Sequence, residues 1–138
     1  MTELRDLRDA NIRRQSKWPG AGAVDLSFRG LELGGEVGEA LNKLKKLIRV
    51  RRGIRGQHTE ERHTQDAELR RAIALELADV VICADLVAME LDIDLDEAVP
   101  RKFDITSHKV GVNSFFERNE ADGETDRLQT DEPGVPAL

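Results

Sequence analysis

The sequence predicts an all-α fold. It is rich in Leu, Ala, Glu and Arg, it has no Tyr, and aromatic residues make up only 4% of it; this usage favours helices over strands. Two long stretches, 25–52 and 66–91, carry apolar residues at spacings of three and four, the period of one helical face. The 138 residues allow one domain with a modest core. Because a partner subunit often completes so small and aromatic-poor a core, we expect a homo-oligomer, either a homodimer or a dimer of dimers.

The first two expected helices are separated by a turn. A helix over residues 2–16 should stop before Trp18-Pro19-Gly20, since Pro and Gly interrupt helices. The second helix is expected over 25–52, with Asp25 as its N-cap and Gly53 as its stop. This pattern predicts two consecutive helices of unequal length.

An apolar stripe with the period of one helical face runs along the second expected helix. Gly34 and Gly35 interrupt this helix, and each costs roughly 1 kcal/mol relative to Ala in a helix interior. They therefore indicate either close packing or a bend, and the sequence leaves both open. The stripe consists of Leu33, Val37, Leu41, Leu44 and Ile48.

The segment 53–65 is polar and lacks apolar periodicity, so it is expected to be a mobile loop. The third helix, over 66–91, carries a wide apolar stripe that suggests burial on more than one side. A shorter helix is expected over 95–107, with Pro100 kinking it or ending its first part. The stripe of the third helix consists of Ile73, Leu77, Val80, Ala84, Val87 and Leu91, widened by Val81 and Ala88.

Charge divides the chain into an expected helical domain over 1–116 and an acidic tail over 117–138. The tail has seven acidic and two basic residues, which give −5 of the formal net charge of −6. The remaining chain is nearly neutral, so a wholly basic nucleic-acid binder is disfavoured. The tail's Gly, Pro and acidic content predicts disorder.

Cellular location follows from the single cysteine and the lack of long apolar segments. Cys83 cannot form an internal disulfide, which fits a reducing compartment. No apolar stretch approaches the ~18 residues that span a bilayer, and the charged N-terminus does not resemble a signal peptide. We expect a soluble, cytoplasmic protein.

Two acidic pairs are the main chemical signal. Glu36 and Glu39 are three residues apart on the second expected helix, and Glu76 and Asp79 are three apart on the third. Residues at this spacing project from one side of a helix, so two antiparallel helices would bring the pairs together. Crowded carboxylates repel each other, and a hard divalent cation such as Mg²⁺ relieves the repulsion. The alternative is that they pair with arginines or face water, although Glu76 and Asp79 interrupt an apolar run where a free charge is costly.

These segments resemble the MazG-like all-α nucleoside triphosphate pyrophosphohydrolases. The stretches 33–41 and 75–80 are similar to the family's two metal helices, and 102–109 is similar to the Lys-Phe-Asn-x-x-Ser-x-Lys segment of one subgroup. Asp104 departs from that pattern, which has Asn there. The resemblance covers roughly residues 10–116 and is weak between the three segments.

The resemblance implies a four-helix-bundle-like fold whose core is completed by oligomerisation. It also implies hydrolysis of a nucleoside or deoxynucleoside triphosphate to the monophosphate and pyrophosphate. Mg²⁺, with Mn²⁺ as a substitute, would bind the four carboxylates, neutralise the triphosphate and orient water. By analogy, Glu39 is the expected general base.

Cations and three other residues are expected to contact the substrate. Lys43 and Lys46 continue the side of Glu36 and Glu39, so either is a candidate phosphate ligand or simply part of a solvated, dipole-complementing helix end. The resemblance adds a further set near the nucleotide, in which Trp18 would stack on the base or pack. This set is Asn11, Trp18, Lys102, Asp104 and Lys109.

Two alternative functions, from other classes of protein, remain open. A non-catalytic helical dimerisation or regulatory module would explain the apolar stripes, but not the acids inside the apolar run at 74–81. A helical nucleic-acid-binding protein would use the basic run at 43–55, although the near-neutral 1–116 segment and the acidic tail weaken that reading.

Overall fold

The computed structural model describes residues 4–54 and 59–116, and within these ranges it is helical without strands. The predicted all-α class is therefore confirmed. No helix in the described ranges is both long and apolar enough to cross a membrane. The elements are α1 (Leu4–Gln15), the short 3₁₀ helix η1 (Ala21–Ala23), α2 (Leu26–Arg51), α3 (Thr59–Glu90) and α4 (Leu95–Val110).

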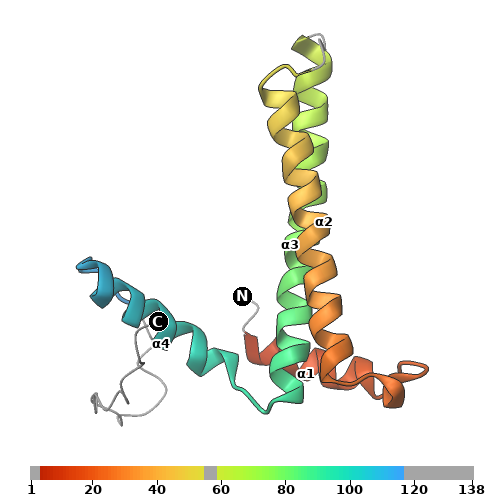
Figure 1. Ribbon diagram of the computed structural model, residues 1–138, viewed down its shortest axis with the longest axis vertical. Helices are drawn as coiled ribbons and strands as arrows, with labels where there is room; N and C mark the ends of the chain where they lie inside the picture. The colour runs from red at the N-terminus through yellow and green to blue at the C-terminus, as the bar shows by residue number, and fades with distance from the viewer. Residues whose placement is uncertain (1–3, 55–58, 117–138) are drawn as a thin grey trace, which may run out of the picture.

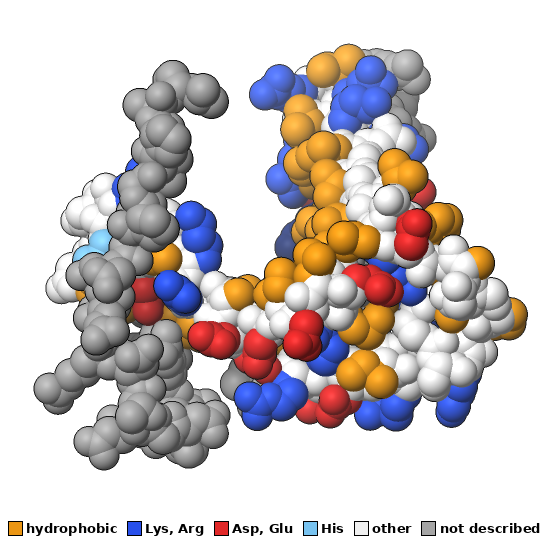
Figure 2. Space-filling model, turned by 60° about the horizontal axis from the view of Figure 1, so that its bottom comes forward, with side chains coloured by type: hydrophobic (Ala, Val, Ile, Leu, Met, Phe, Trp, Pro, Cys, Tyr) orange, Lys and Arg blue, Asp and Glu red, His pale blue; other side chains and the backbone are white. Residues whose placement is uncertain are grey.

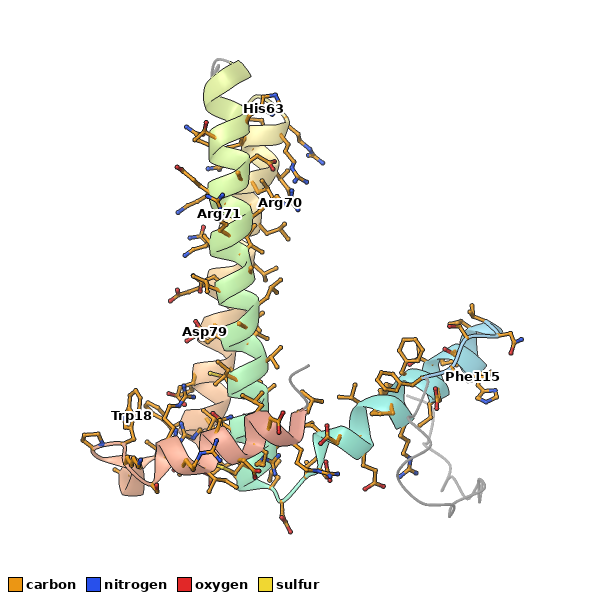
Figure 3. All side chains as sticks on the ribbon, turned by 180° about the vertical axis from the view of Figure 1, so that it is seen from behind. Trp18, His63, Arg70, Arg71, Asp79 and Phe115 are labelled. Atoms are coloured by element: carbon orange, nitrogen blue, oxygen red, sulfur yellow. The ribbon has the colours of Figure 1, made fainter. Side chains whose placement is uncertain are left out.

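The two longest helices, α2 and α3, form an antiparallel hairpin that stands above the rest of the molecule (Figure 1). The 26 residues of α2 make it about 39 Å long. Helix α1 crosses the foot of the hairpin (Figure 3), and α4 leaves the same foot as a separate arm that contacts α1. The expected tail, 117–138, and residues 55–58 lie outside the described ranges.

Capping and turn residues explain where two of these helices begin and end. Asp25 is the N-cap of α2, as predicted, and its carboxylate accepts a hydrogen bond from Phe28 N at 2.9 Å. Gly53, just beyond α2, has a φ of 63°, a left-handed conformation that glycine adopts without strain. Asp94 caps α4 by accepting a hydrogen bond from Asp96 N at 2.8 Å.

Two predicted boundaries were wrong. Helix α3 begins at Thr59, so residues 59–65, expected to lie in a mobile loop, are helical. These residues contain neither Gly nor Pro, and their polarity fits a helix end that projects beyond the core. Helix α4 runs through Pro100 to Val110, because one proline removes one backbone hydrogen bond and nothing else interrupts the helix.

The seam between α2 and α3 contains both apolar and charged residues. Ala40, Leu47 and Val50 are buried on α2, and Glu36 and Lys43 are half-buried on the same side of the helix. These positions are spaced by 4, 3, 4 and 3 residues, the pattern of a helix–helix seam. On α3 the corresponding half-buried positions are Glu76, Val80, Cys83 and Val87.

The apolar stripe predicted on α2 consists mainly of the residues that directly follow the seam positions, and it is largely exposed. The exposed fractions are 39% for Val37, 59% for Leu41, 41% for Leu44 and 39% for Ile48, so these four residues are not buried within this chain. The seam positions 36 and 43 carry charged residues with partners on α3, which apolar periodicity alone cannot detect.

The two interior glycines of α2 do not interrupt the helix, and no part of this chain packs closely against them. The helix is continuous through Gly34 and Gly35, and a Cβ added at either position would meet nothing within 4 Å. Close packing within this chain therefore does not explain these two glycines.

Candidate metal centre

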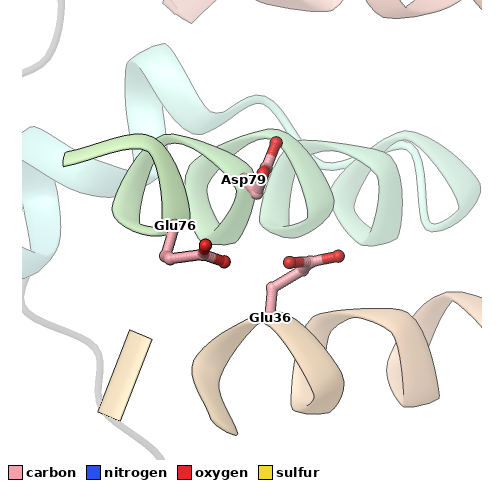
Figure 4. A group of neighbouring side chains, drawn as sticks. All are labelled: Glu36, Glu76 and Asp79. Atoms are coloured by element: carbon pink, nitrogen blue, oxygen red, sulfur yellow. The ribbon is translucent and has the colours of Figure 1, made fainter. Parts of the chain in front are cut away.

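Three of the four predicted acidic residues converge between α2 and α3. Glu36, Glu76 and Asp79 each offer a carboxylate oxygen, and these oxygens all lie within 4.8 Å of one another (Figure 4). We call these three residues the carboxylate group. Glu36 and Glu76 are half-buried, whereas Asp79 is exposed and leaves the group open to solvent.

Ion pairs across the hairpin show the register that brings these acids together. Lys43 Nζ lies 2.5 Å from Glu76 Oε1, and Arg51 Nε donates to Asp66 Oδ2 at 2.6 Å. Glu36 precedes Lys43 by two helical turns, so this antiparallel register places it beside the part of α3 that follows Glu76. The three-residue spacing places Asp79 on the same side of α3 as Glu76.

The carboxylate group carries an electrostatic cost at Glu36. Partial burial raises the pKa of this carboxyl above its ordinary value, and neighbouring carboxylates raise it further because like charges oppose ionisation. In decreasing order of effect these neighbours are Asp79, Glu39, Glu76 and Glu32. The site therefore favours a cation.

Lys43 supplies part of that positive charge. Its hydrogen bond to Glu76 raises the pKa of the Lys43 ammonium, which keeps it protonated. With all three carboxylates ionised, the group and Lys43 together carry a net charge of −2. Oxygen donors of this charge suit a hard divalent cation such as Mg²⁺.

Glu39, the fourth predicted ligand and the expected base, lies outside the carboxylate group. It is exposed on α2, yet its charge is close enough to raise the pKa values of Glu36 and Lys43. The structure thus brings together three carboxylates and leaves the role of Glu39 a prediction.

The predicted substrate residues of the first two helices are dispersed. Asn11 is 2% exposed at the contact of α1 with α3, and its amide donates to Asp85 Oδ2 at 2.8 Å. Trp18, beyond the end of α1, is 58% exposed (Figure 3). Lys46 is exposed and lines a shallow hollow between α2 and α3.

The predicted residues of α4 are not beside the carboxylate group. Lys102 and Lys109 are exposed on the arm that leaves the hairpin foot (Figure 1). Asp104, the departure from the family pattern, accepts a hydrogen bond from Phe116 N at 2.7 Å, so it holds the segment after α4 against that helix.

Sequence reasoning missed two buried charged residues near the foot. Asp85 is 1% exposed and pairs with Arg8 and Asn11, and Arg29 is 5% exposed and bonds Glu32 at 2.8 Å. Asp85 interrupts the apolar run 80–88, the same signal that marked Glu76 and Asp79, and could have been found from it.

Together, these features define an all-helical protein with an acidic group suited to a divalent cation. No protein-family model matches the sequence, and it matches neither a curated protein nor a solved structure.

Proposed function

We propose that the protein is a Mg²⁺-dependent nucleotide pyrophosphohydrolase that cleaves a nucleoside or deoxynucleoside triphosphate between its α- and β-phosphates. The observation that carries the proposal is the convergence of three carboxylates from two helices within 4.8 Å. The sequence resemblance to MazG-like enzymes supplies the reaction type.

The residues present fit the proposed metal. Glu36, Glu76 and Asp79 would hold Mg²⁺ or Mn²⁺ through their carboxylate oxygens, and the bound ion would relieve the repulsion among the three negative charges. When bound, the ion would neutralise the triphosphate and orient the attacking water. Lys43 would then share Glu76 with the ion or turn toward a phosphate.

The remaining chemistry belongs to exposed side chains around the group. In the proposed reaction the water oxygen bonds to the α-phosphorus, the bond to the bridging oxygen breaks, and pyrophosphate leaves. Glu39, which is exposed on α2 and close enough to raise the pKa of Glu36, would accept the water's proton. Lys46, farther along the same helix, stays a proposed phosphate contact. Trp18 and Asn11, together with the α4 residues Lys102, Asp104 and Lys109, remain proposed nucleotide contacts.

The test is pyrophosphate release from a panel of NTPs and dNTPs with and without Mg²⁺. We expect activity that a chelator removes and that Glu36→Gln or Asp79→Asn abolishes while the helical circular dichroism spectrum persists. Glu68→Gln is the matched control, since Glu68 is an exposed acid on α3, the helix that carries Asp79, and lies outside the carboxylate group. Full turnover in the two ligand variants would refute the metal assignment.

A second function, a non-catalytic helical dimerisation or regulatory module, is favoured by one observation. The α2–α3 hairpin exposes large apolar side chains, including Leu41 at 59% and Leu77 at 53%. We propose a homodimer or dimer of dimers for either function. The module reading predicts no pyrophosphate release from any nucleotide and no effect of Mg²⁺ on the melting temperature.

A further inference from the structure

A buried arginine joins helix ends at the foot of the hairpin, where α2 begins and α3 ends. Figure 2 shows acidic and basic side chains on the surface around this foot, and exposed ion pairs of that kind contribute little to stability. Arg29, near the start of α2, differs from them because it is only 5% exposed. Its Nη1 donates to Glu32 Oε2 at 2.8 Å, and its Nη2 donates at 2.6 Å to Oε1 of Gln15, the last residue of α1.

The remaining nitrogen of this guanidinium is not satisfied. Arg29 Nε is buried and has no hydrogen-bond partner among residues 4–54 and 59–116. It lies 3.9 Å from Oε1 of Glu90, the last residue of α3, which is too far for a hydrogen bond. A buried N–H without an acceptor costs free energy, and an approach of Glu90 by about 1 Å would remove that cost. Arg29 thus has two carboxylates close by and bonds only one of them.

Glu32, the carboxylate that Arg29 does bond, is also close to the carboxylate group. It precedes Glu36 by four residues, so the two side chains leave the same side of α2 about 5–6 Å apart. Burial is the main cause of the raised pKa values of Glu36 and of the Cys83 thiol, and the charge of Glu32 raises both further. Cys83 follows Asp79 by four residues on α3, so Glu32 acts on the foot side of the carboxylate group from across the seam.

The two acids beside Arg29 have room to move, whereas the arginine has little. The side chains of Glu32 and Glu90 are 35% and 33% exposed, and that of Arg29 is 5% exposed. The bond to Gln15 also fixes the guanidinium to α1. An exchange of partners would therefore move the acids around a nearly stationary arginine.

We infer that Glu32 is an exchangeable ligand of the metal centre. Without a cation, Arg29 holds Glu32; with a divalent cation in the carboxylate group, Glu32 turns to the ion and Arg29 Nε donates to Glu90. The buried guanidinium keeps one carboxylate partner in both states, so no buried charge is left unpaired. Mg²⁺ takes an octahedron of oxygen ligands, which leaves positions beyond the three carboxylates of the group. The inference rests on the metal assignment of the proposed function and not on the hydrolysis.

The first experiment measures the affinity of the full chain for Mn²⁺ without nucleotide, from the electron paramagnetic resonance signal of the free ion. Glu32→Gln and Glu32→Asp are each expected to weaken binding at least about tenfold, since even a residue behind a metal ligand is typically worth that much. Glu32→Asp decides between ligation and charge, because it keeps the charge and only shortens the side chain. Glu68→Gln, which removes an exposed acid of α3 outside the group, is the control and should leave the affinity unchanged.

The second experiment follows Arg29 in the unmodified chain by ¹⁵N NMR. The signal of its Nε–H group is assigned by its loss in Arg29→Lys. Saturating Mg²⁺, which is diamagnetic, is expected to shift this signal and to slow its exchange with water, because Nε gains Glu90 as an acceptor. The change should shrink in Glu90→Gln, since a neutral amide oxygen is a weaker acceptor than a carboxylate.

These measurements separate the exchange from the proposed hydrolysis. An Mn²⁺ affinity that Glu32→Asp leaves unchanged, or an Arg29 Nε–H signal that Mg²⁺ does not move, would overturn the exchange and leave the hydrolysis standing. If both results were as expected but no nucleotide released pyrophosphate, the hydrolysis would be refuted and the exchange supported. Absence of Mn²⁺ binding by the unmodified chain would overturn both.

Discussion

Replacing Asp85 should release α1 from the hairpin. Asp85 is 1% exposed, and its carboxylate accepts hydrogen bonds from Arg8 Nε at 3.0 Å and from Asn11 Nδ2 at 2.8 Å. Arg8 also donates to the Ile93 carbonyl at 2.8 Å, which ties the α3–α4 turn to the same point. One carboxylate thus joins α1, α3 and the turn from which α4 leaves.

The expected cost is large because the buried Asn11 and the half-buried Arg8 both lose their acceptor. In Asp85→Ala, Arg8 loses a charge-assisted bond and the Asn11 amide, 2% exposed, loses its best acceptor. Removing one member of a buried ion pair typically costs about 3–5 kcal/mol. For a domain of this size that loss corresponds to a fall in melting temperature on the order of 10–20 °C. Asp85→Asn keeps one oxygen acceptor, so we expect a smaller loss of about 1.5–3 kcal/mol.

Thermal and urea denaturation followed by circular dichroism, at one fixed protein concentration, measures this cost. Asp9→Ala is the control, because Asp9 is an exposed acid on the same α1 helix and its loss should change the melting temperature little. If Asp85→Ala melted within about 2 °C of the unmodified chain, Asp85 would not be the buried anchor that joins α1 to α3.

Three further predictions concern the hairpin. The pKa of Glu36 is higher in the folded chain than in the unfolded one, so without metal its contribution to stability is present below its ordinary pKa and is lost as the pH rises through the raised pKa. The rise in melting temperature that Mg²⁺ causes should show the opposite trend and shrink as the pH falls. In a pH series of thermal melts, Glu36→Gln should show neither trend. Lys43→Met should lower the melting temperature without metal and enlarge the rise that Mg²⁺ causes, because Lys43 competes with the ion for Glu76; an unchanged or smaller Mg²⁺ effect would refute that competition. Gly35→Ala should raise the free energy of unfolding by about 0.5–1 kcal/mol in urea titrations, since the added methyl meets nothing within 4 Å in a continuous helix, and a destabilised variant would mean that another surface occupies that space.

The sequence predicted the helices well because their signals are local. Asp25 as an N-cap, Gly53 just after α2 and apolar residues at spacings of three and four depend on a few neighbouring residues, and the structure has the corresponding helices. The spacing of Glu76 and Asp79 on one helix is equally local, so their shared side followed from the sequence. The start of α3 at Thr59 was missed because a projecting polar helix end lacks the apolar periodicity that marks a packed helix.

What the sequence alone determined is thus the all-helical class, the two long helices and the acids that could meet between them. Only the tertiary structure decided which residues form the seam, because a rotation of 100° separates buried Ala40 from exposed Leu41 and both are apolar. It also separated Glu39 from Glu36, and it buried Asp85 against Arg8 and Asn11. Such outcomes depend on contacts between helices far apart in the chain, and no pattern within a single helix encodes them.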